Sequence, residues 1–395
     1  MVRLNKNILP VAVVFVFLLI SFVCTQTSFS METEAEGGVL NVDAKSSILI
    51  EASSGKVLYE NNADERLAPA SVTKTMTILL IYEAVASGKI SWDDVVTVSE
   101  HAASMGGSQV FLEPNEQQPV RELVKSIVIA SANDAAVAMA EFVAGSEESF
   151  VALMNERAKT LGCENTHFKN ACGLDEDGHY TSARDMAKIA KEIINKHSSI
   201  FEFTKTWQDS ITHKTRRGEE EFGLTNTNKL IRWYNGATGL KTGSTGRALY
   251  CLVGTAEKND LSLVSVVLAA PTPNIRFQEV MKMLDYGYAN FKTAQGMSAG
   301  TEAGEAVVTK GAEEAVKASV KSNVCVVVPK ASSGELETVI NMDSVEAPVS
   351  AGDKVGEVIY SYDGKEIGRS DLVAAEDVEK AGFVDVAKRL IKIWR

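Results

Sequence analysis

The sequence predicts a mixed α/β (α+β) domain with a helical subdomain, followed by a small all-β domain and a C-terminal amphipathic helix. Apolar runs typical of strands occur near residue 50 and again between residues 238 and 269, and helical patterns fill the stretch between them. Strands at both ends of a helical stretch indicate one sheet assembled from distant segments. A second series of β-type runs, between residues 306 and 372, indicates the separate all-β domain.

The first domain is expected over residues 39–293. It opens with a hairpin, because two apolar runs at 47–51 and 56–59 flank a Ser-Ser-Gly turn. Helices are expected from Pro69 to Gly88 and over residues 120–130, 135–144, 150–161 and 183–194, the last with Ser182 as its N-cap. Strands at 238–241, 248–255 and 261–269 and a helix ending near Phe291 complete this domain.

The second domain is expected over residues 297–375; a small and polar, linker-like stretch at 296–304 precedes its β-type runs. Its clearest strands are 324–328 and 355–360. It contains no histidine and no cluster of polar residues of a catalytic kind. We therefore interpret it as a spacer or an interaction module.

Composition excludes several classes of protein. The chain has 395 residues and a formal net charge of −12, with 45% hydrophobic and 23% charged residues. These fractions are ordinary for globular proteins, so wholesale disorder, collagen-like repeats and a polytopic membrane protein are excluded. An acidic chain also lacks the basic face that nucleic-acid binding requires. Neither a Walker loop nor a dinucleotide-binding glycine pattern is present.

The first 30 residues have a composition of their own. Arg3 and Lys6 precede an apolar run at 8–23 and a small, polar tail, which is typical of a secretory signal peptide. The alternative is an uncleaved anchor, but ~16 apolar residues are few for a membrane span that needs ~20. We therefore expect a protein that is secreted across the cytoplasmic membrane.

Residues 377–395 predict an amphipathic helix. Phe383, Ala387, Leu390 and Trp394 recur at helical spacing, while basic residues lie mostly on the opposite side. A basic amphipathic helix that ends in Trp is typical of a helix lying in the membrane interface. The alternative is a helix docked on the protein's own core. We expect peripheral attachment to the extracytoplasmic face of the membrane.

Four cysteines follow the signal, namely Cys163, Cys172, Cys251 and Cys325, and their spacing matches no zinc site. Two interpretations stay open. Cys163 and Cys172 are near enough in sequence for a local disulfide, and the simpler expectation is that all four are small buried apolar residues.

The first of three chemical motifs is Ser71-Val72-Thr73-Lys74, directly after Pro69-Ala70. If Pro69 starts a helix, the i, i+3 spacing puts the Ser71 hydroxyl and the Lys74 amine on one face. A lysine whose pKa is lowered by burial can take the serine proton, and free N–H groups at the helix start can stabilise an oxyanion. The alternative is an ordinary helix start.

The second motif, Ser131-Ala132-Asn133, follows an apolar helix. Ser131 is suited to relay a proton between Lys74 and a leaving amine, and the Asn133 amide to hold a substrate amide and orient Lys74. The alternative is a capping segment between two helices.

The third motif is Lys241-Thr242-Gly243, on a strand predicted to lie at the sheet edge. Such an edge can pair with an extended peptide, and Gly243 would let that ligand approach the backbone. Lys241 and Thr242 supply a cation and a hydroxyl suited to a carboxylate. The alternative is a turn.

In the order S-x-x-K, S-x-N, K-T-G, these motifs resemble the penicillin-binding protein and serine β-lactamase superfamily, most of all its low-molecular-mass D-alanyl-D-alanine carboxypeptidases. Residues 107–112 and 179–183 are also similar to that family, as are the β-rich second domain and the C-terminal helix. The resemblance covers the chain from about Ala44 to its end, and it implies a β-lactamase/transpeptidase-like fold for the first domain.

The resemblance implies a role for each matching residue. Ser71 would be the acylated nucleophile and Lys74 its general base. Ser131 and Asn133 would complete the proton relay and bind substrate.

Lys241 with Thr242 would bind the substrate's terminal carboxylate. The N–H groups of Ser71 and Ser244 would form the oxyanion hole. Ser244 stands where the family often has a bulkier residue, so only its backbone is carried over. Arg276 falls about where the family has an arginine that meets the substrate carboxylate; helix packing or a surface salt bridge is the alternative.

The activity implied is that of a serine DD-carboxypeptidase, which releases the terminal D-Ala of a peptidoglycan stem peptide of the diaminopimelate or lysine type. Penicillins would acylate the same Ser71, and no metal or organic cofactor is implied. A β-lactamase on the same fold would need a water-activating element such as E-x-x-L-N, and none follows S-x-N. A non-catalytic wall-binding scaffold fits poorly with three intact motifs.

The acidic segment 175–179 predicts a solvated turn rather than a metal site.

Overall fold

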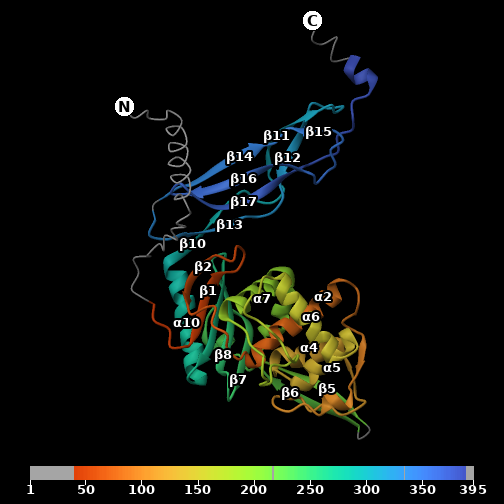
Figure 1. The fold of residues 1–395 in the computed structure, drawn as a ribbon, viewed down its shortest axis with the longest axis vertical. Helices are drawn as coiled ribbons and strands as arrows, with labels where there is room; N and C mark the ends of the chain where they lie inside the picture. The colour runs from red at the N-terminus through yellow and green to blue at the C-terminus, as the bar shows by residue number, and fades with distance from the viewer. Residues whose placement is uncertain (1–39, 216–217, 333, 388–395) are drawn as a thin grey trace, which may run out of the picture. The chain divides into compact units, whose positions relative to one another are not determined.

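The computed structural model of the chain describes residues 40–215, 218–332 and 334–387. The predicted signal peptide lies outside these residues. The first domain is built on a five-stranded sheet in the order β2-β1-β9-β8-β7 (Figure 1). Every pair of neighbours in it is antiparallel. The strands are β1 (Ser46–Glu51), β2 (Val57–Asn61), β7 (Ala237–Thr245), β8 (Leu249–Lys258) and β9 (Leu261–Ala270).

The sheet joins distant parts of the chain, as the sequence predicts. β1 pairs along its whole length with β9, so that Ile48 lies opposite Val266. Both strands are buried on both faces, which explains why they read as nearly continuous apolar runs rather than alternating ones.

One face of the sheet is covered by α10 (Pro273–Asn290). The Thr272 side chain caps this helix by accepting the Ile275 N–H, and Pro273 occupies its first turn. Apolar residues of α10 and of the sheet form one buried cluster that includes Leu49, Leu252, Leu263, Phe277, Val280, Met283 and Leu284.

The helical subdomain covers the other face (Figure 1). Its main helices are α2 (Lys74–Ala86), α4 (Val120–Ile129), α5 (Asn133–Ala144), α6 (Glu147–Thr160) and α7 (Ala183–Lys196). All five expected helices are therefore present. α6 begins three residues before its expected start, because Ser146 caps it by accepting the Ser149 N–H. The predicted cap of α7 is confirmed, since the Ser182 hydroxyl accepts the Asp185 N–H.

Several short or polar elements were not expected from the sequence. The largest is a hairpin of β5 (Gln208–Thr215) and β6 (Gly218–Thr225), whose strands are mostly exposed. β6 starts with Gly-Glu-Glu-Glu, so it lacks the apolar alternation that identifies a strand. The others are β3 (Val95–Thr97), α3 (Glu100–Ala103), β4 (Gln117–Pro119), η2 (Ser198–Ile200), α8 (Phe201–Thr204) and α9 (Leu230–Trp233).

The second domain is all-β, as expected. A six-stranded sheet has the order β14-β16-β17-β12-β11-β15, and β10 pairs with β13. The bounds are β10 (Phe291–Gln295), β11 (Glu302–Thr309), β12 (Ala315–Val320), β13 (Cys325–Pro329), β14 (Leu336–Met342), β15 (Val345–Glu346), β16 (Lys354–Tyr362) and β17 (Lys365–Ala374). The linker predicted at 296–304 is shorter than expected, because β11 takes its last residues.

The C-terminal segment is helical over residues 383–387, and the rest of the predicted amphipathic helix, residues 388–395, lies outside the described residues. Phe383, Val384 and Val386 are 90%, 61% and 46% exposed, so this first turn is not docked on the protein's core. None of the helices in the described ranges has the length and apolar composition needed to cross a membrane.

The structure decides between the two interpretations of Cys163 and Cys172. Cys163, Cys172 and Cys251 are buried and free, so a Cys163–Cys172 disulfide is wrong. The two thiols face different groups: Cys163 Sγ lies 3.8 Å from the Asp185 carbonyl oxygen, and Cys172 Sγ lies 3.6 Å from Asn170 Oδ1. The side chain of Cys325 lies outside the described part of the chain.

Candidate active site

The turn before α2 brings the first two candidate residues together. Pro69 precedes a 3₁₀ turn, η1 (Ala70–Thr73), which runs directly into α2. A 3₁₀ turn has three residues per turn, so residues i and i+3 eclipse each other. Ser71 Oγ and Lys74 Nζ are accordingly 3.0 Å apart. The sequence predicts this juxtaposition correctly, although it predicts an α-helical rather than a 3₁₀ start.

Lys74 is completely buried. Its Nζ donates to Asn133 Oδ1 at 2.6 Å and to the Cys172 carbonyl oxygen at 2.7 Å. Burial lowers the pKa of Lys74 to about 8, so a useful fraction of the amine is neutral near pH 7. A neutral amine keeps two N–H donors for Asn133 and Cys172 and presents its lone pair to the Ser71 hydroxyl.

The second segment is the turn between α4 and α5. Ser131 is 4% exposed and has a left-handed backbone, with φ of +62°. For a residue other than glycine this costs on the order of 1–3 kcal/mol, and such strain clusters at active sites. Ala132 is the N-cap of α5 and makes no side-chain cap bond, which argues against a simple capping segment.

Asn133 opens α5 and is fixed from three directions. Its N–H donates to the Ser108 carbonyl oxygen at 2.7 Å, and its Nδ2 donates to the Gly106 carbonyl oxygen at 2.6 Å. With Nδ2 engaged in this way, Oδ1 is left to face Lys74. Lys74 thus joins Ser71 and Asn133 through direct hydrogen bonds.

The third segment is β7, which has a strand neighbour on one side only among the described strands. The predicted edge position is confirmed. Lys241 and Thr242 are buried, whereas Ser244 is exposed. The Thr242 hydroxyl lies 2.7 Å from the Thr227 hydroxyl, which fixes its rotamer.

Gly243 packs against the turn that carries Ser71. A Cβ atom at this position would lie 2.8 Å from the Ser71 nitrogen and 2.9 Å from the Val72 nitrogen. Only glycine therefore lets β7 pack directly on η1. We expected the missing side chain of Gly243 to leave room for a ligand. Instead, the space that a Cβ would take is filled by the turn that carries Ser71.

Three cations approach one another beside β7. Burial lowers the pKa of Lys241 well below its usual value, and the charges of Lys74 and Arg276 lower it further. Arg276, on α10, is buried and donates from Nη1 to the Gly243 carbonyl oxygen at 3.0 Å. This burial excludes a surface salt bridge as the role of Arg276. An anionic group that binds here would relieve the repulsion among these cations.

The segment 171–179 contributes groups that the sequence did not indicate. The Cys172 carbonyl binds Lys74, and a backbone oxygen carries no sequence signal. Gly173 has φ of +91°, and a Cβ there would lie 1.9 Å from the Ala70 carbonyl oxygen. Within the described ranges no group of three or more His, Cys, Asp or Glu residues could hold a metal ion.

The predicted solvated turn at 175–179 is wrong for His179. This side chain is 4% exposed and its Nε2 lies 3.0 Å from the hydroxyl of Thr73, the last residue of η1. Burial lowers the pKa of His179 to about 4. Asp175 accepts a hydrogen bond from the Thr245 hydroxyl at 2.7 Å and so ties this turn to the end of β7.

A substitution tests the packing of β7 on η1. We expect Gly243→Ala to lower kcat/KM about 100-fold, because its Cβ must push the strand away from the turn that carries Ser71, and small displacements of reacting groups cause losses of this size. Gly246→Ala is the matched control, since a Cβ at Gly246 meets nothing within 4 Å. Equal activity of the two variants would contradict the close packing.

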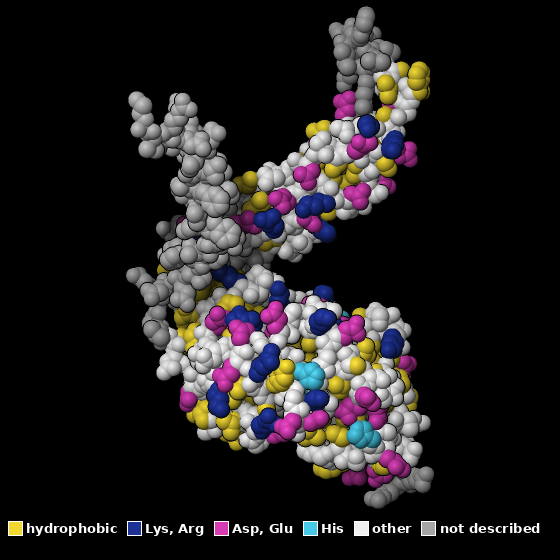
Figure 2. Space-filling model, viewed as in Figure 1, with side chains coloured by type: hydrophobic (Ala, Val, Ile, Leu, Met, Phe, Trp, Pro, Cys, Tyr) yellow, Lys and Arg dark blue, Asp and Glu magenta, His cyan; other side chains and the backbone are white. Residues whose placement is uncertain are grey.

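The surface of the first domain carries side chains of both charges. On the face shown in Figure 2, acidic and basic side chains are interspersed over the first domain, without a continuous basic area.

Comparison with known proteins identifies the family of this chain over most of its length. Residues 30–272 match the family model described as D-alanyl-D-alanine carboxypeptidase, and residues 291–380 match that of the penicillin-binding protein 5 C-terminal domain. The chain is 44% identical over 370 residues to D-alanyl-D-alanine carboxypeptidase DacF of Bacillus subtilis, covering 93% of this chain and 94% of that protein. It is 36% identical to DacA of Escherichia coli over 90% of both chains.

A solved structure supports the same assignment. Penicillin binding protein 5 from Haemophilus influenzae superposes with a TM-score of 0.74 at 33% identity, over 86% of this chain and 98% of that one. The matches span both domains, and the fold is the transpeptidase-like one that the resemblance implied. The chain therefore belongs to the D-alanyl-D-alanine carboxypeptidase family.

Proposed function

We propose that this chain removes the terminal D-alanine from peptidoglycan stem peptides through an acyl-enzyme on Ser71. The observation that carries the proposal is the 3.0 Å approach of Ser71 Oγ to the buried Lys74 Nζ, beside the edge strand β7. A serine, a base of lowered pKa and an open strand edge are the parts that acyl transfer from a peptide requires.

Acylation begins when neutral Lys74 accepts the Ser71 proton. Ser71 Oγ then bonds to the carbonyl carbon of the penultimate D-Ala, and the resulting oxyanion accepts hydrogen bonds from the N–H groups of Ser71 and Ser244. As the C–N bond breaks, the proton passes from Lys74 through Ser131 to the leaving amine, while Asn133 holds the acyl side. The free D-Ala departs, and water attacks the ester to regenerate Ser71.

Recognition of the carboxyl terminus falls to the residues around K-T-G. Lys241 and Thr242 bind the substrate carboxylate, and Arg276 adds positive charge from behind the strand, through its bond to the Gly243 carbonyl. The substrate backbone pairs along the free edge of β7 as an additional strand. β-Lactams occupy the same position and acylate the same hydroxyl.

The lowered pKa of Lys74 predicts a rise of activity with pH. The base must be neutral, and it is protonated below its pKa of about 8, so kcat/KM should increase tenfold per pH unit below pH 7 and level off above about pH 9. The measurement is kcat/KM for D-Ala release between pH 5.5 and 10. A profile that is flat across pH 8 would contradict Lys74 as the base.

One assay tests the proposed function. The chain without residues 1–30 is incubated with a diacyl-D-Ala-D-Ala peptide and, separately, with a labelled penicillin. We expect stoichiometric release of D-Ala and a stable label in the proteolytic fragment that contains Ser71. Absence of both would overturn the proposal, and fast penicillin turnover without D-Ala release would establish a β-lactamase instead.

We also propose that the chain acts outside the cytoplasmic membrane, attached to it by residues 377–395. The exposure of Phe383, Val384 and Val386 supports this, because they present an uncovered apolar face at the start of the helix. Deletion of 382–395 should abolish sedimentation with vesicles containing anionic lipid. Val339→Asp, at an exposed apolar position of β14, is the control that should still sediment. Sedimentation of the deletion variant would contradict membrane attachment through residues 377–395.

A further inference from the structure

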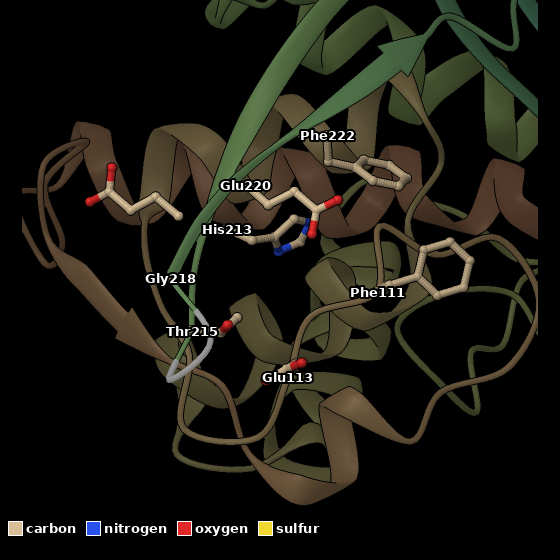
Figure 3. A pocket seen from close by; sticks show the side chains of 8 residues that line it. Phe111, Glu113, His213, Thr215, Gly218, Glu220 and Phe222 are labelled. Atoms are coloured by element: carbon tan, nitrogen blue, oxygen red, sulfur yellow. The ribbon is translucent and has the colours of Figure 1, made fainter.

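A pocket near the active site has no part in the chemistry described above. It has a volume of ≈ 420 Å³ and lies between the loop that follows α3 and the β5–β6 hairpin (Figure 3). Phe111 comes from the loop, and Phe222 and His213 come from the hairpin. The rings of Phe111 and Phe222 meet edge to face with centroids 5.9 Å apart, and His213 packs against Phe222 at 5.6 Å.

Phe111 is held in a costly position. Its side chain is 66% exposed, and its backbone has φ of +62°, a conformation that bulky residues rarely adopt. The buried Asp134 carboxylate keeps it there, because it accepts hydrogen bonds from the N–H groups on both sides, Val110 at 3.2 Å and Leu112 at 3.1 Å. An exposed ring held in this way by a neighbour of Asn133 indicates a binding role rather than core packing.

His213 adds an unsatisfied polar atom. Its side chain is buried, and its Nδ1 lies 2.8 Å from Glu116 Oε1. Since a carboxylate can only accept, Nδ1 donates, and a neutral imidazole then has an acceptor at Nε2. This Nε2 is buried and has no hydrogen-bond partner in the described part of the chain. Such an atom costs free energy that a donor arriving with a ligand would recover.

Both walls of the pocket are close in sequence to residues of the candidate active site. Phe111 is four residues from Gly107, where a Cβ would lie 2.7 Å from Asn133 Nδ2. Phe222 is five residues from Thr227, whose hydroxyl binds that of Thr242. Four or five residues of extended chain span at most about 14–18 Å.

These lengths of chain set only an upper bound on the distance, and an extended substrate reaches most of it. The third residue from the carboxyl terminus has its Cα about 5 Å from the acyl carbon, and a side chain of four methylenes and a nitrogen adds about 6 Å, so that its amine lies up to about 11 Å from that carbon. That residue is the lysine or diaminopimelate of the stem peptide, and both side chains are long, aliphatic and end in an amine.

We propose that Phe111, Phe222 and His213 form a subsite for this side chain. The methylenes pack on the two phenyl rings, and the amine donates to His213 Nε2. The inference rests on the proposed function, because it requires an extended stem peptide with its terminal residues at Ser71. It makes the pocket the place where the enzyme recognises the amino acid that precedes D-Ala-D-Ala.

Three peptides of the form acetyl-X-D-Ala-D-Ala test the subsite, with X as lysine, norleucine or alanine. For the unmodified chain we expect kcat/KM to fall in that order, with norleucine about tenfold above alanine, because it offers three more methylenes. Lysine should exceed norleucine several-fold through its amine. Phe111→Gly removes the ring and relieves the backbone, so the variant is expected to fold. It should lose about tenfold on the lysine and norleucine peptides and stay within twofold on the alanine peptide.

The outcomes separate the two proposals. If no peptide releases D-Ala with the unmodified chain, the proposed function itself fails. If all three peptides react equally well, or if Phe111→Gly lowers all three equally, the subsite is wrong while the carboxypeptidase activity stands. Equal rates for lysine and norleucine would overturn the role of His213 Nε2. Leu153→Ala, at an exposed apolar position of α6, is the control that should leave all three rates unchanged.

Discussion

Ser71→Ala is expected to lower D-Ala release by a factor on the order of 10⁴ or more and to abolish labelling by penicillin. In the proposed function the loss is large because the hydroxyl is the group that becomes acylated, and Lys74 has nothing to deprotonate once it is gone. The measurements are D-Ala release from a diacyl-D-Ala-D-Ala peptide and the mass of the protein after incubation with penicillin.

The matching control is Ser87→Ala. Ser87 ends the same helix, where its hydroxyl donates to the Ala84 carbonyl oxygen at 3.1 Å. This variant should keep full activity, and both variants should unfold at nearly the same urea concentration. Substantial labelling of the Ser71→Ala protein would show that another residue is the nucleophile.

Lys74→Arg is expected to lower the acylation rate about 10³-fold while leaving the protein folded. Arginine keeps the positive charge and can still donate to Asn133 Oδ1 and the Cys172 carbonyl, but a guanidinium does not give up its proton near neutral pH. The substitution therefore removes the base and keeps the cation. General-base catalysis contributes factors of about 10²–10⁴, which sets the expected size.

The rate of acylation by a labelled penicillin, followed by rapid quench at pH 8, measures this effect. Lys188→Arg, on α7 at a partly exposed position, is the control and should acylate at the unmodified rate. Retention of more than a tenth of the rate in Lys74→Arg would mean that the positive charge of Lys74, rather than its lone pair, is what the reaction uses.

Local sequence patterns predict most of the fold because most elements are either apolar or capped. The five long helices and the buried strands follow from periodicity, and the edge position of Lys241-Thr242-Gly243 follows from the order of the strands. The β5–β6 hairpin could not be predicted in this way, since it is polar and has few buried side chains. It supplies two of the three residues of the proposed subsite.

The candidate active site, like the fold, is only partly predictable from the sequence. The residue types of Ser71, Lys74 and Asn133 suggest their chemistry, but their orientation depends on backbone carbonyls of Gly106, Ser108 and Cys172 that no residue type identifies. The pKa of Lys74 likewise follows from complete burial, which is a property of the folded domain. His179 shows the opposite error, because its acidic and glycine-rich neighbours suggest solvent while the ring is buried.

The pairing of β1 with β9 determines when, during synthesis, activity can first appear. Ser71 is made early, yet the sheet that supports it closes only after β9 has joined β1, and the Ser71 turn rests on Gly243 of β7. Helices of the middle segment can form as they emerge, whereas contacts this distant in sequence form late and slowly. A nascent chain that stops before residue 270 contains Ser71 but lacks the complete sheet on which the Ser71 turn packs. The enzyme is thus expected to be inert until nearly the whole first domain has been released.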